Sequence, residues 1–325
     1  MNSPTHKRII IIAGIAILLL GLGGGGYYWY TQSQVDTNST GRSADTTTDS
    51  ESTDWDALPT TEVTLSDEPL AITSAGTYIL SGSTNAGITV NSNGNVRLLL
   101  NGTAISNTDG TAITIEKANL AVIETASGSQ NTLTDSASRS DEDHDAVIYA
   151  TGDITFAGSG TLTIDAQFKH GIMSTRNLTI DSGTYTITSN VGNAIKADLN
   201  LTVNDGTIAV PNSEEGMEAP LVTINDGTID IYATDDGING SESDLNSSPV
   251  ITINGGTITV KVADGDTDAI DSNGDLIING GTINLTGQST IDFDGNGELN
   301  GGTLILNGQQ VSALPAQMMG GGQPQ

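Results

Sequence analysis

The sequence predicts an all-β protein built as a parallel β-helix, a solenoid in which each coil of the chain stacks on the coil before it. A Gly-Thr pair recurs along the second half of the chain, and apolar side chains occupy every second position around it. Alternation with a period of two is typical of strands, and a repeat of 20–50 residues is typical of solenoids. Gly, Asn and Asp separate the alternating segments, and no helical pattern follows Tyr30. The pairs lie 23, 23, 21, 29, 25 and 21 residues apart, at Gly160-Thr161, Gly183-Thr184, Gly206-Thr207, Gly227-Thr228, Gly256-Thr257, Gly281-Thr282 and Gly302-Thr303.

A second repeated string lies between successive Gly-Thr pairs. It has four residues, and the third is always apolar, so we expect these side chains to point inward in one stack: Ile172, Ile195, Met217, Ile238, Ile270 and Ile291. The first and fourth residues flank the apolar one on the surface. Because neighbouring strands are ~4.8 Å apart, equivalent positions should form ladders. One predicted ladder contains Glu215, Asp236 and Asp268, and the other contains Glu218, Asn239, Asp271 and Asp292.

The acidic ladders predict calcium sites. Carboxylates stacked this closely repel one another, so their pKa values rise or a cation binds between them. Calcium takes six to eight oxygen ligands, and the absence of Cys together with three scattered His argues against zinc. The alternative interpretation is that acidic turn residues only keep the solenoid soluble. The predicted ligands are Glu215, Glu218, Asp235, Asp236, Asn239, Asp264, Asp266, Asp268, Asp271, Asp292 and Asp294.

The charge of the chain narrows the choice of partners. The formal net charge is -29, which excludes ordinary nucleic-acid binding because phosphate would be repelled. Between Asp205 and Glu298 there are 18 acidic residues and one basic residue, Lys261. Salt bridges cannot neutralise such a segment, so we expect another cation to do so.

The N-terminal segment predicts export. Lys7 and Arg8 precede an apolar stretch, residues 9–30, whose 22 residues are enough to span a bilayer, for which ~20 are needed. The basic residues suit the cytoplasmic side and the aromatic cluster Tyr27–Tyr30 suits the far interface. We expect a membrane anchor that holds the protein at a bacterial cell surface. A cleaved signal peptide, which would give a secreted protein, is the alternative.

The remaining chain divides by composition. Residues 1–8 form the cytoplasmic end, and residues 31–57, rich in Ser, Thr and Asp, are expected to be a disordered linker. Residues 58–311 carry the strand pattern and form the β-helix. Residues 312–325 read as a flexible tail. We expect a monomer.

Several strings resemble one family closely. They include Gly76-Thr77-Tyr78-Ile79-Leu80-Ser81-Gly82, Asp268-Ala269-Ile270-Asp271-Ser272-Asn273-Gly274 and Asp292-Phe293-Asp294-Gly295. From about residue 63 to 317 the chain resembles a bacterial carbohydrate-binding domain family that was first catalogued as a domain of unknown function. The resemblance implies a right-handed, single-stranded parallel β-helix related in shape to pectate lyases. It also implies calcium binding and polysaccharide ligands such as cellulose and polygalacturonate, and hence calcium-dependent binding of a cell-wall polysaccharide.

Two other functions remain open. A polysaccharide lyase needs a cation to neutralise the uronate and a base to take the α-proton, and Lys196, with Lys169 and His170 one coil earlier, is the candidate base. The lyase would be calcium-dependent. A purely structural, calcium-stiffened adhesin or stalk is the other alternative. Aromatic side chains that could stack on a sugar are few: Trp55, Tyr149, Tyr185, Tyr232 and Phe293.

Overall fold

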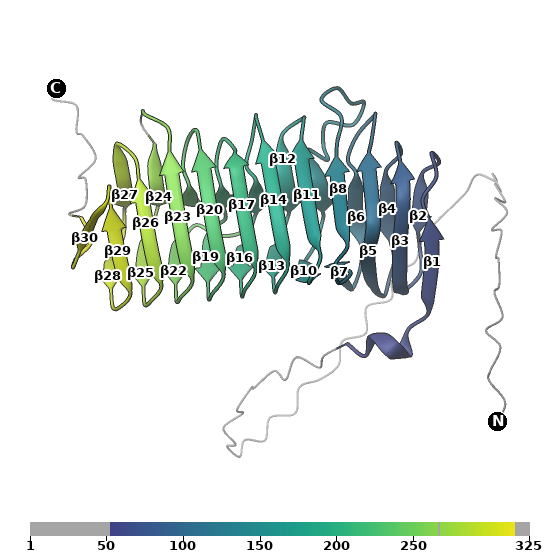
Figure 1. The fold of residues 1–325 in the computed structure, drawn as a ribbon, viewed down its shortest axis with the longest axis horizontal. Helices are drawn as coiled ribbons and strands as arrows, with labels where there is room; N and C mark the ends of the chain where they lie inside the picture. Colours follow the sequence, from purple (N-terminus) through teal and green to yellow (C-terminus); the bar gives the residue numbers. More distant parts are fainter. Residues whose placement is uncertain (1–52, 266, 316–325) are drawn as a thin grey trace, which may run out of the picture. The chain divides into compact units, whose positions relative to one another are not determined.

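The computed structural model describes residues 53–265 and 267–315, and this part of the chain is all-β, with parallel strands in stacked sheets. Its coils follow one another along a single axis (Figure 1), as the repeat predicts. One 3-10 turn, Trp55–Ala57, precedes the first strand. The expected anchor at residues 9–30, the expected linker 31–57 as far as residue 52, and the expected tail beyond residue 315 lie outside the described residues. The 3-10 turn falls within the expected linker, so the prediction of disorder is wrong for the last residues of that segment. Among those described, no helix is long and apolar enough to cross a membrane.

Most coils contribute three strands, two to a 20-stranded sheet (the large sheet) and one to a 10-stranded sheet (the small sheet). In the large sheet one strand of each coil belongs to a first series: β7 (Leu120–Thr125), β10 (Ile154–Gly158), β13 (Asn177–Ile180), β16 (Asn200–Val203), β19 (Leu221–Ile224), β22 (Val250–Ile253), β25 (Asp275–Ile278) and β28 (Gly297–Leu299). The other belongs to a second series: β8 (Gln130–Thr134), β11 (Thr161–Ala166), β14 (Thr184–Ser189), β17 (Thr207–Asn212), β20 (Thr228–Ala233), β23 (Thr257–Val262), β26 (Thr282–Thr286) and β29 (Thr303–Leu306).

At the N-terminal end the two series merge, because β5 (Asn95–Ser106) pairs with both β7 and β8. Strands β1 (Thr60–Thr64) and β3 (Gly76–Thr84) complete that end. The small sheet consists of β2 (Leu70–Ile72), β4 (Ile88–Asn91), β6 (Ile113–Lys117), β9 (Ala146–Ala150), β12 (His170–Ser174), β15 (Ile195–Ala197), β18 (Met217–Glu218), β21 (Ile238–Gly240), β24 (Asp268–Ser272) and β27 (Ser289–Phe293).

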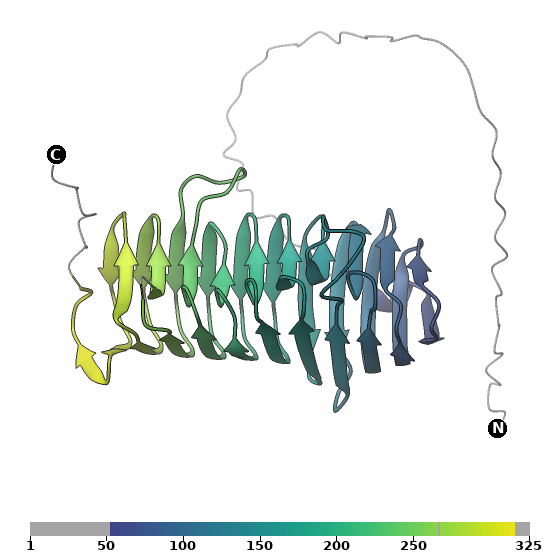
Figure 2. The same ribbon diagram turned by 90° about the horizontal axis from the view of Figure 1, so that it is seen from above.

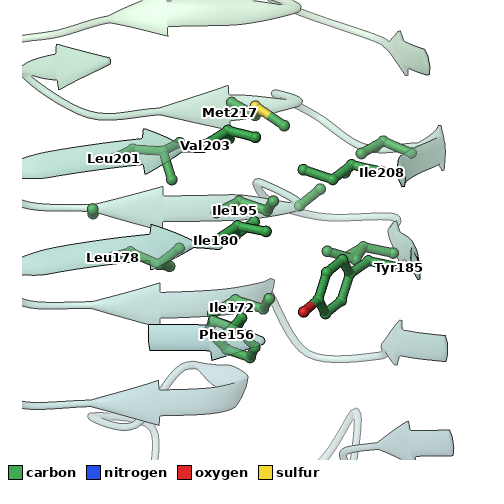
Figure 3. Packing of buried hydrophobic residues seen from close by; sticks show 14 of the residues in the cluster. Phe156, Ile172, Leu178, Ile180, Tyr185, Ile195, Leu201, Val203, Ile208 and Met217 are labelled. Carbon is green, nitrogen blue, oxygen red and sulfur yellow. The ribbon is translucent and has the colours of Figure 1, made fainter. Parts of the chain in front are cut away.

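The predicted apolar stack is confirmed. The six residues of the repeated string pair in register down the small sheet, and each is at most 4% exposed. Figure 3 shows three of them, Ile172, Ile195 and Met217, packed against inward side chains of the large sheet. Tyr185 lies in the same interior, edge-on to Phe156 with ring centroids 6.1 Å apart. It is 1% exposed, so it cannot be the sugar-stacking surface considered from the sequence.

The recurring Gly-Thr pair marks a tight corner before each strand of the second series. Gly206 has φ +122°, a conformation that only glycine adopts readily, and a Cβ there would lie 3.0 Å from Gly183 O. The glycines of successive coils therefore stack backbone on backbone. A larger residue would push the coils apart.

A hydrogen-bonded ladder of asparagines follows the strands of the first series from β16 to β28. The side-chain nitrogen of each asparagine donates to the side-chain oxygen of its equivalent one coil earlier, over 2.7–3.0 Å, and the last acceptor is Asp181. The members are Asn204, Asn225, Asn254, Asn279 and Asn300. This ladder holds five coil-to-coil steps in register.

Two further features break the repeat. The last two described strands form a hairpin, in which β30 (Gln309–Val311) runs antiparallel to β29 after the two-residue turn Asn307-Gly308. The loop between β21 and β22, residues 241–249, projects from the solenoid (Figure 2). The Ser243 hydroxyl of this loop donates to Asp198 O, which ties the loop back to an earlier coil.

Candidate functional site

Both predicted polar ladders form on the outward face of the small sheet. Strand pairing places Lys196, Glu218, Asn239, Asp271 and Asp292 in one row, which we call the carboxylate ladder. Tyr149 and Met173 extend this row toward the N-terminus. The residues three positions earlier form a parallel row, the corner ladder, made of His170, Asn193, Glu215, Asp236 and Asp268. The two ladders lie side by side because the string that carries them repeats once per coil.

Glu215 and Glu218 are the centre of one polar cluster. The Asn193 amide nitrogen donates to both carboxylates, at 2.9 Å for Glu215 and over a shorter contact for Glu218. Glu218 also accepts from the Lys196 ammonium and, at 2.6 Å, from the Ser241 hydroxyl. The loop that carries Ser241 is thereby tied to the carboxylate ladder.

The two carboxyls of this cluster titrate differently. Burial raises the pKa of Glu215 to about 8, and the negative charge of Glu218 adds to the effect. Burial acts on Glu218 too, but the Lys196 charge and the hydrogen bonds from Lys196, Ser241 and Asn193 outweigh it and lower the pKa of Glu218. Glu218 therefore carries the negative charge of the pair.

A second cluster, around Asp271, is acidic, and the charged residues that most affect its pKa are all carboxylates. Burial raises the pKa of Asp271 to about 7, and the charges of Asp236, Asp268, Asp292 and Asp294 raise it further in that order. Next to it in the ladder, Asn239 is 8% exposed, and its side-chain oxygen has no hydrogen-bond partner among the described residues. A buried acceptor without a partner costs free energy. A cation at this point would both satisfy the oxygen and reduce the repulsion.

The donors suit calcium in kind but are not gathered into a ready coordination shell. Among the residues that the structure describes, no group of three or more His, Cys, Asp or Glu side chains is arranged to hold a metal ion. An ion between the ladders would therefore complete its shell with amide, carbonyl, water or ligand oxygens.

Three other predicted ligands are not members of the ladders. Asp235 is half-buried just before β21, Asp264 is exposed after β23, and Asp294 is exposed after β27. Asp266 lies outside the described residues. The loops that carry Asp235, Asp264 and Asp294 differ in length, so these residues are not held in a common register as the strand residues are.

The candidate bases for lyase chemistry are all engaged with neighbouring residues. Lys169 donates to Asp145 at 2.6 Å, and Lys196 donates to Glu218. His170 is 4% exposed and its Nδ1 accepts from Asn193 N at 3.0 Å. Burial lowers the pKa of His170 to about 4, so the ring is neutral at pH 7.

Sequence reasoning missed a groove on the outward face of the first series. This hollow of about 370 Å³, which we call the threonine groove, crosses β7, β10, β13 and β16 and is lined by Leu120, Asp153, Ile154, Thr155, Asn177, Thr179, Asn200 and Thr202. A repeated signal was present in the sequence. The central threonine of Ile154-Thr155-Phe156 recurs in Leu178-Thr179-Ile180 and Leu201-Thr202-Val203.

The sequence and the fold are both similar to those of known proteins. A family model described as carbohydrate-binding domain-containing protein matches residues 66–310. A protein of that description from Acetivibrio thermocellus is 35% identical over 126 residues, which cover 36% of this chain and 44% of the relative, so the match spans less than half of the relative's length. The solved structure of a polysaccharide lyase-like protein from C. thermocellum, a gadolinium derivative, superposes with a TM-score of 0.54 at 27% identity. It covers 79% of this chain and 91% of its own.

Proposed function

The chain belongs to the carbohydrate-binding domain-containing protein family, and from this premise we infer that it binds a cell-wall polysaccharide on the outward face of the small sheet. The observation that carries the placement is the pairing of the carboxylate ladder with the corner ladder. From Glu218 to Asp292 the carboxylate ladder is a continuous row of oxygen ligands on regular strands, which hold side chains more rigidly than loops do, and the corner ladder lies beside it at or just before the start of each strand. Tyr149, which is half-buried, prolongs the row and offers a less polar surface to a sugar ring.

The proposal includes calcium, with Asn239, Asp271 and their ladder neighbours as ligands. The partnerless oxygen of Asn239 and the raised pKa of Asp271 both support a cation at this position. An acidic polysaccharide such as polygalacturonate would be repelled by a chain of net charge -29 unless a cation lay between them. A neutral polysaccharide has no such need.

We expect calcium to be required for polygalacturonate binding. Calorimetry should detect calcium binding to residues 53–325, and a pull-down on polygalacturonate should retain the protein with calcium and lose it with a chelator. Asp271→Asn removes one ligand charge and should weaken calcium binding by about tenfold. Asp230→Asn removes the same charge from an exposed position of the large sheet and should change neither result.

Other outcomes of this experiment would favour other functions. If neither calcium heat nor glycan retention is observed, the proposal is wrong and a structural stalk is favoured. New ultraviolet absorbance from unsaturated oligosaccharide would favour a lyase. That second candidate is supported by the neighbour's lyase-like description and by Lys196, which lies in the carboxylate ladder beside Glu218. The contacts of Lys196 and the neutral His170 leave binding as the better-supported function.

The protein is proposed to act at a bacterial cell surface. In this proposal residues 9–30, which precede the solenoid, form the membrane anchor, and the solenoid is right-handed. We expect N-terminal sequencing of the protein isolated from membranes to recover the anchor, because its length and flanking basic residues suit a spanning segment. A mature N-terminus beyond Tyr30, with the protein in the culture medium, would instead establish a cleaved signal peptide.

A further inference from the structure

We propose that the threonine groove is a second polysaccharide-binding surface, selective for a neutral glycan chain and independent of calcium. The proposal rests on the family's carbohydrate binding but uses a different face of the solenoid. The calcium-dependent surface lies on the small sheet, whereas this groove crosses four strands of the large sheet. At about 370 Å³ the hollow has the size of a small-ligand site.

The groove presents hydroxyl groups that the protein itself does not use. Thr155, Thr179 and Thr202 pair in register on adjacent strands. All three are half-buried, and none of their hydroxyls has a hydrogen-bond partner among the described residues. A hydroxyl both donates and accepts, as the hydroxyls of a sugar do. The row continues beyond the groove through Thr223 and Thr252, so it extends over five coils at ~4.8 Å steps.

A row of ordered amides runs alongside the threonines. Asn177 Nδ2 donates to Asp153 Oδ1 at 2.8 Å, and Asn200 Nδ2 donates to Asn177 Oδ1 at 2.6 Å. These bonds fix the amide planes two residues before the threonines on the same strands. Two parallel polar rows therefore follow the solenoid axis, which suits an extended polymer laid across the strands.

The backbone beneath the groove is held rigid by the core. Figure 3 shows that Phe156, Leu178, Ile180, Leu201 and Val203, from the same three strands, pack into the interior. Their packing fixes the strand register and hence the spacing of the hydroxyls. A surface ordered before the ligand arrives loses less conformational entropy on binding.

The charge of the groove selects a neutral ligand. Asp153 is the one acidic residue among the lining residues, and Arg176 lies 3.6 Å from it. This local balance contrasts with the four carboxylates whose charges raise the pKa of Asp271. A neutral glycan meets no repulsion here, and no cation is needed to bring it in. A protein partner would usually require a more aromatic and apolar contact surface.

The test removes the hydroxyls while keeping the shape of the side chains. The triple variant Thr155→Val, Thr179→Val, Thr202→Val should fold normally, because valine suits strands and no internal hydrogen bond is lost. Losing three hydrogen bonds to the ligand should weaken binding to insoluble cellulose roughly a hundredfold. The loss should be the same with calcium and with chelator, and calcium-dependent retention on polygalacturonate should be unchanged.

The matched control is the triple variant Thr184→Val, Thr207→Val, Thr228→Val, which alters an equally regular row on the second series. It should bind cellulose as the wild type does. A separate variant, Thr179→Gln, fills the groove without adding charge and should also weaken cellulose binding. Wild-type cellulose binding in the groove triple variant would overturn the proposal, as would loss of cellulose binding by the wild type in chelator. Failure of polygalacturonate retention alone would contradict the proposed calcium-dependent function and leave this inference standing.

Discussion

Replacing Ile238 by aspartate should destabilise the solenoid by at least about 4 kcal/mol. Ile238 is fully buried in the middle of the apolar stack, between Met217 and Ile270. The variant loses the packing of a branched side chain and places a carboxylate where no cation or donor can reach it. A urea unfolding curve followed by circular dichroism measures the change.

Ile238→Val is the control for this prediction. It removes one methylene group and should cost about 1 kcal/mol, because the stack stays apolar. If the aspartate variant unfolds at the same urea concentration as the wild type, the inward assignment of this position is wrong.

Replacing Arg139 by methionine should cost about 3–5 kcal/mol, because it leaves a buried carboxylate without its partner. The side chains of Arg139 and Asp135 are fully buried and in direct contact. Arg139 also donates to His144 O at 2.6 Å and stacks over Phe168, with its guanidinium carbon 4.2 Å from the ring centre. This pair secures the loop between β8 and β9. The measurement is again the urea midpoint, together with proteolysis of the loop.

The double variant Asp135→Asn, Arg139→Met separates the two contributions. Removing the carboxylate charge as well should recover part of the lost stability, because no unpaired charge remains buried. An equal or larger loss in the double variant would show that the unpaired charge of Asp135 is not the main cost, and that Arg139 acts through its packing on Phe168 and its hydrogen bonds to the loop.

Most of the architecture could be predicted from the sequence repeat. The inward stack and both outward ladders follow from the spacing of the strings, because stacking coils places equivalent residues one strand apart. In the same way, the resemblance to carbohydrate-binding domains agrees with the family assignment of residues 66–310. What the sequence cannot supply is the effect of burial at single positions of a ladder.

Arg139 and Asn239 show why burial at single positions cannot be predicted from the repeat. From the sequence Arg139 is one more basic residue among few, yet a non-repeating loop folds it into the interior. Asn239 occupies a ladder position like its neighbours, and only the packing of the surrounding side chains leaves its oxygen buried without a partner. The threonine groove was missed for another reason. Threonine is common at outward strand positions, so a row of threonines does not by itself predict a binding surface. Only the hydrogen bonds of the folded protein show that the hydroxyls in the groove have no partner among the described residues.

The C-terminal hairpin has a consequence for self-assembly. A stack of parallel coils has no inherent last member, since the outer edge of each strand offers the same unpaired groups as the one before. Strand β30 turns back through Asn307-Gly308 and occupies the edge of β29 with antiparallel bonds. It thus works as a chain terminator does in polymer chemistry. Because β30 pairs with the edge of β29, no further strand can add to the second series at that edge. A protein truncated at residue 306 would retain that reactive end and should associate end to end into fibres.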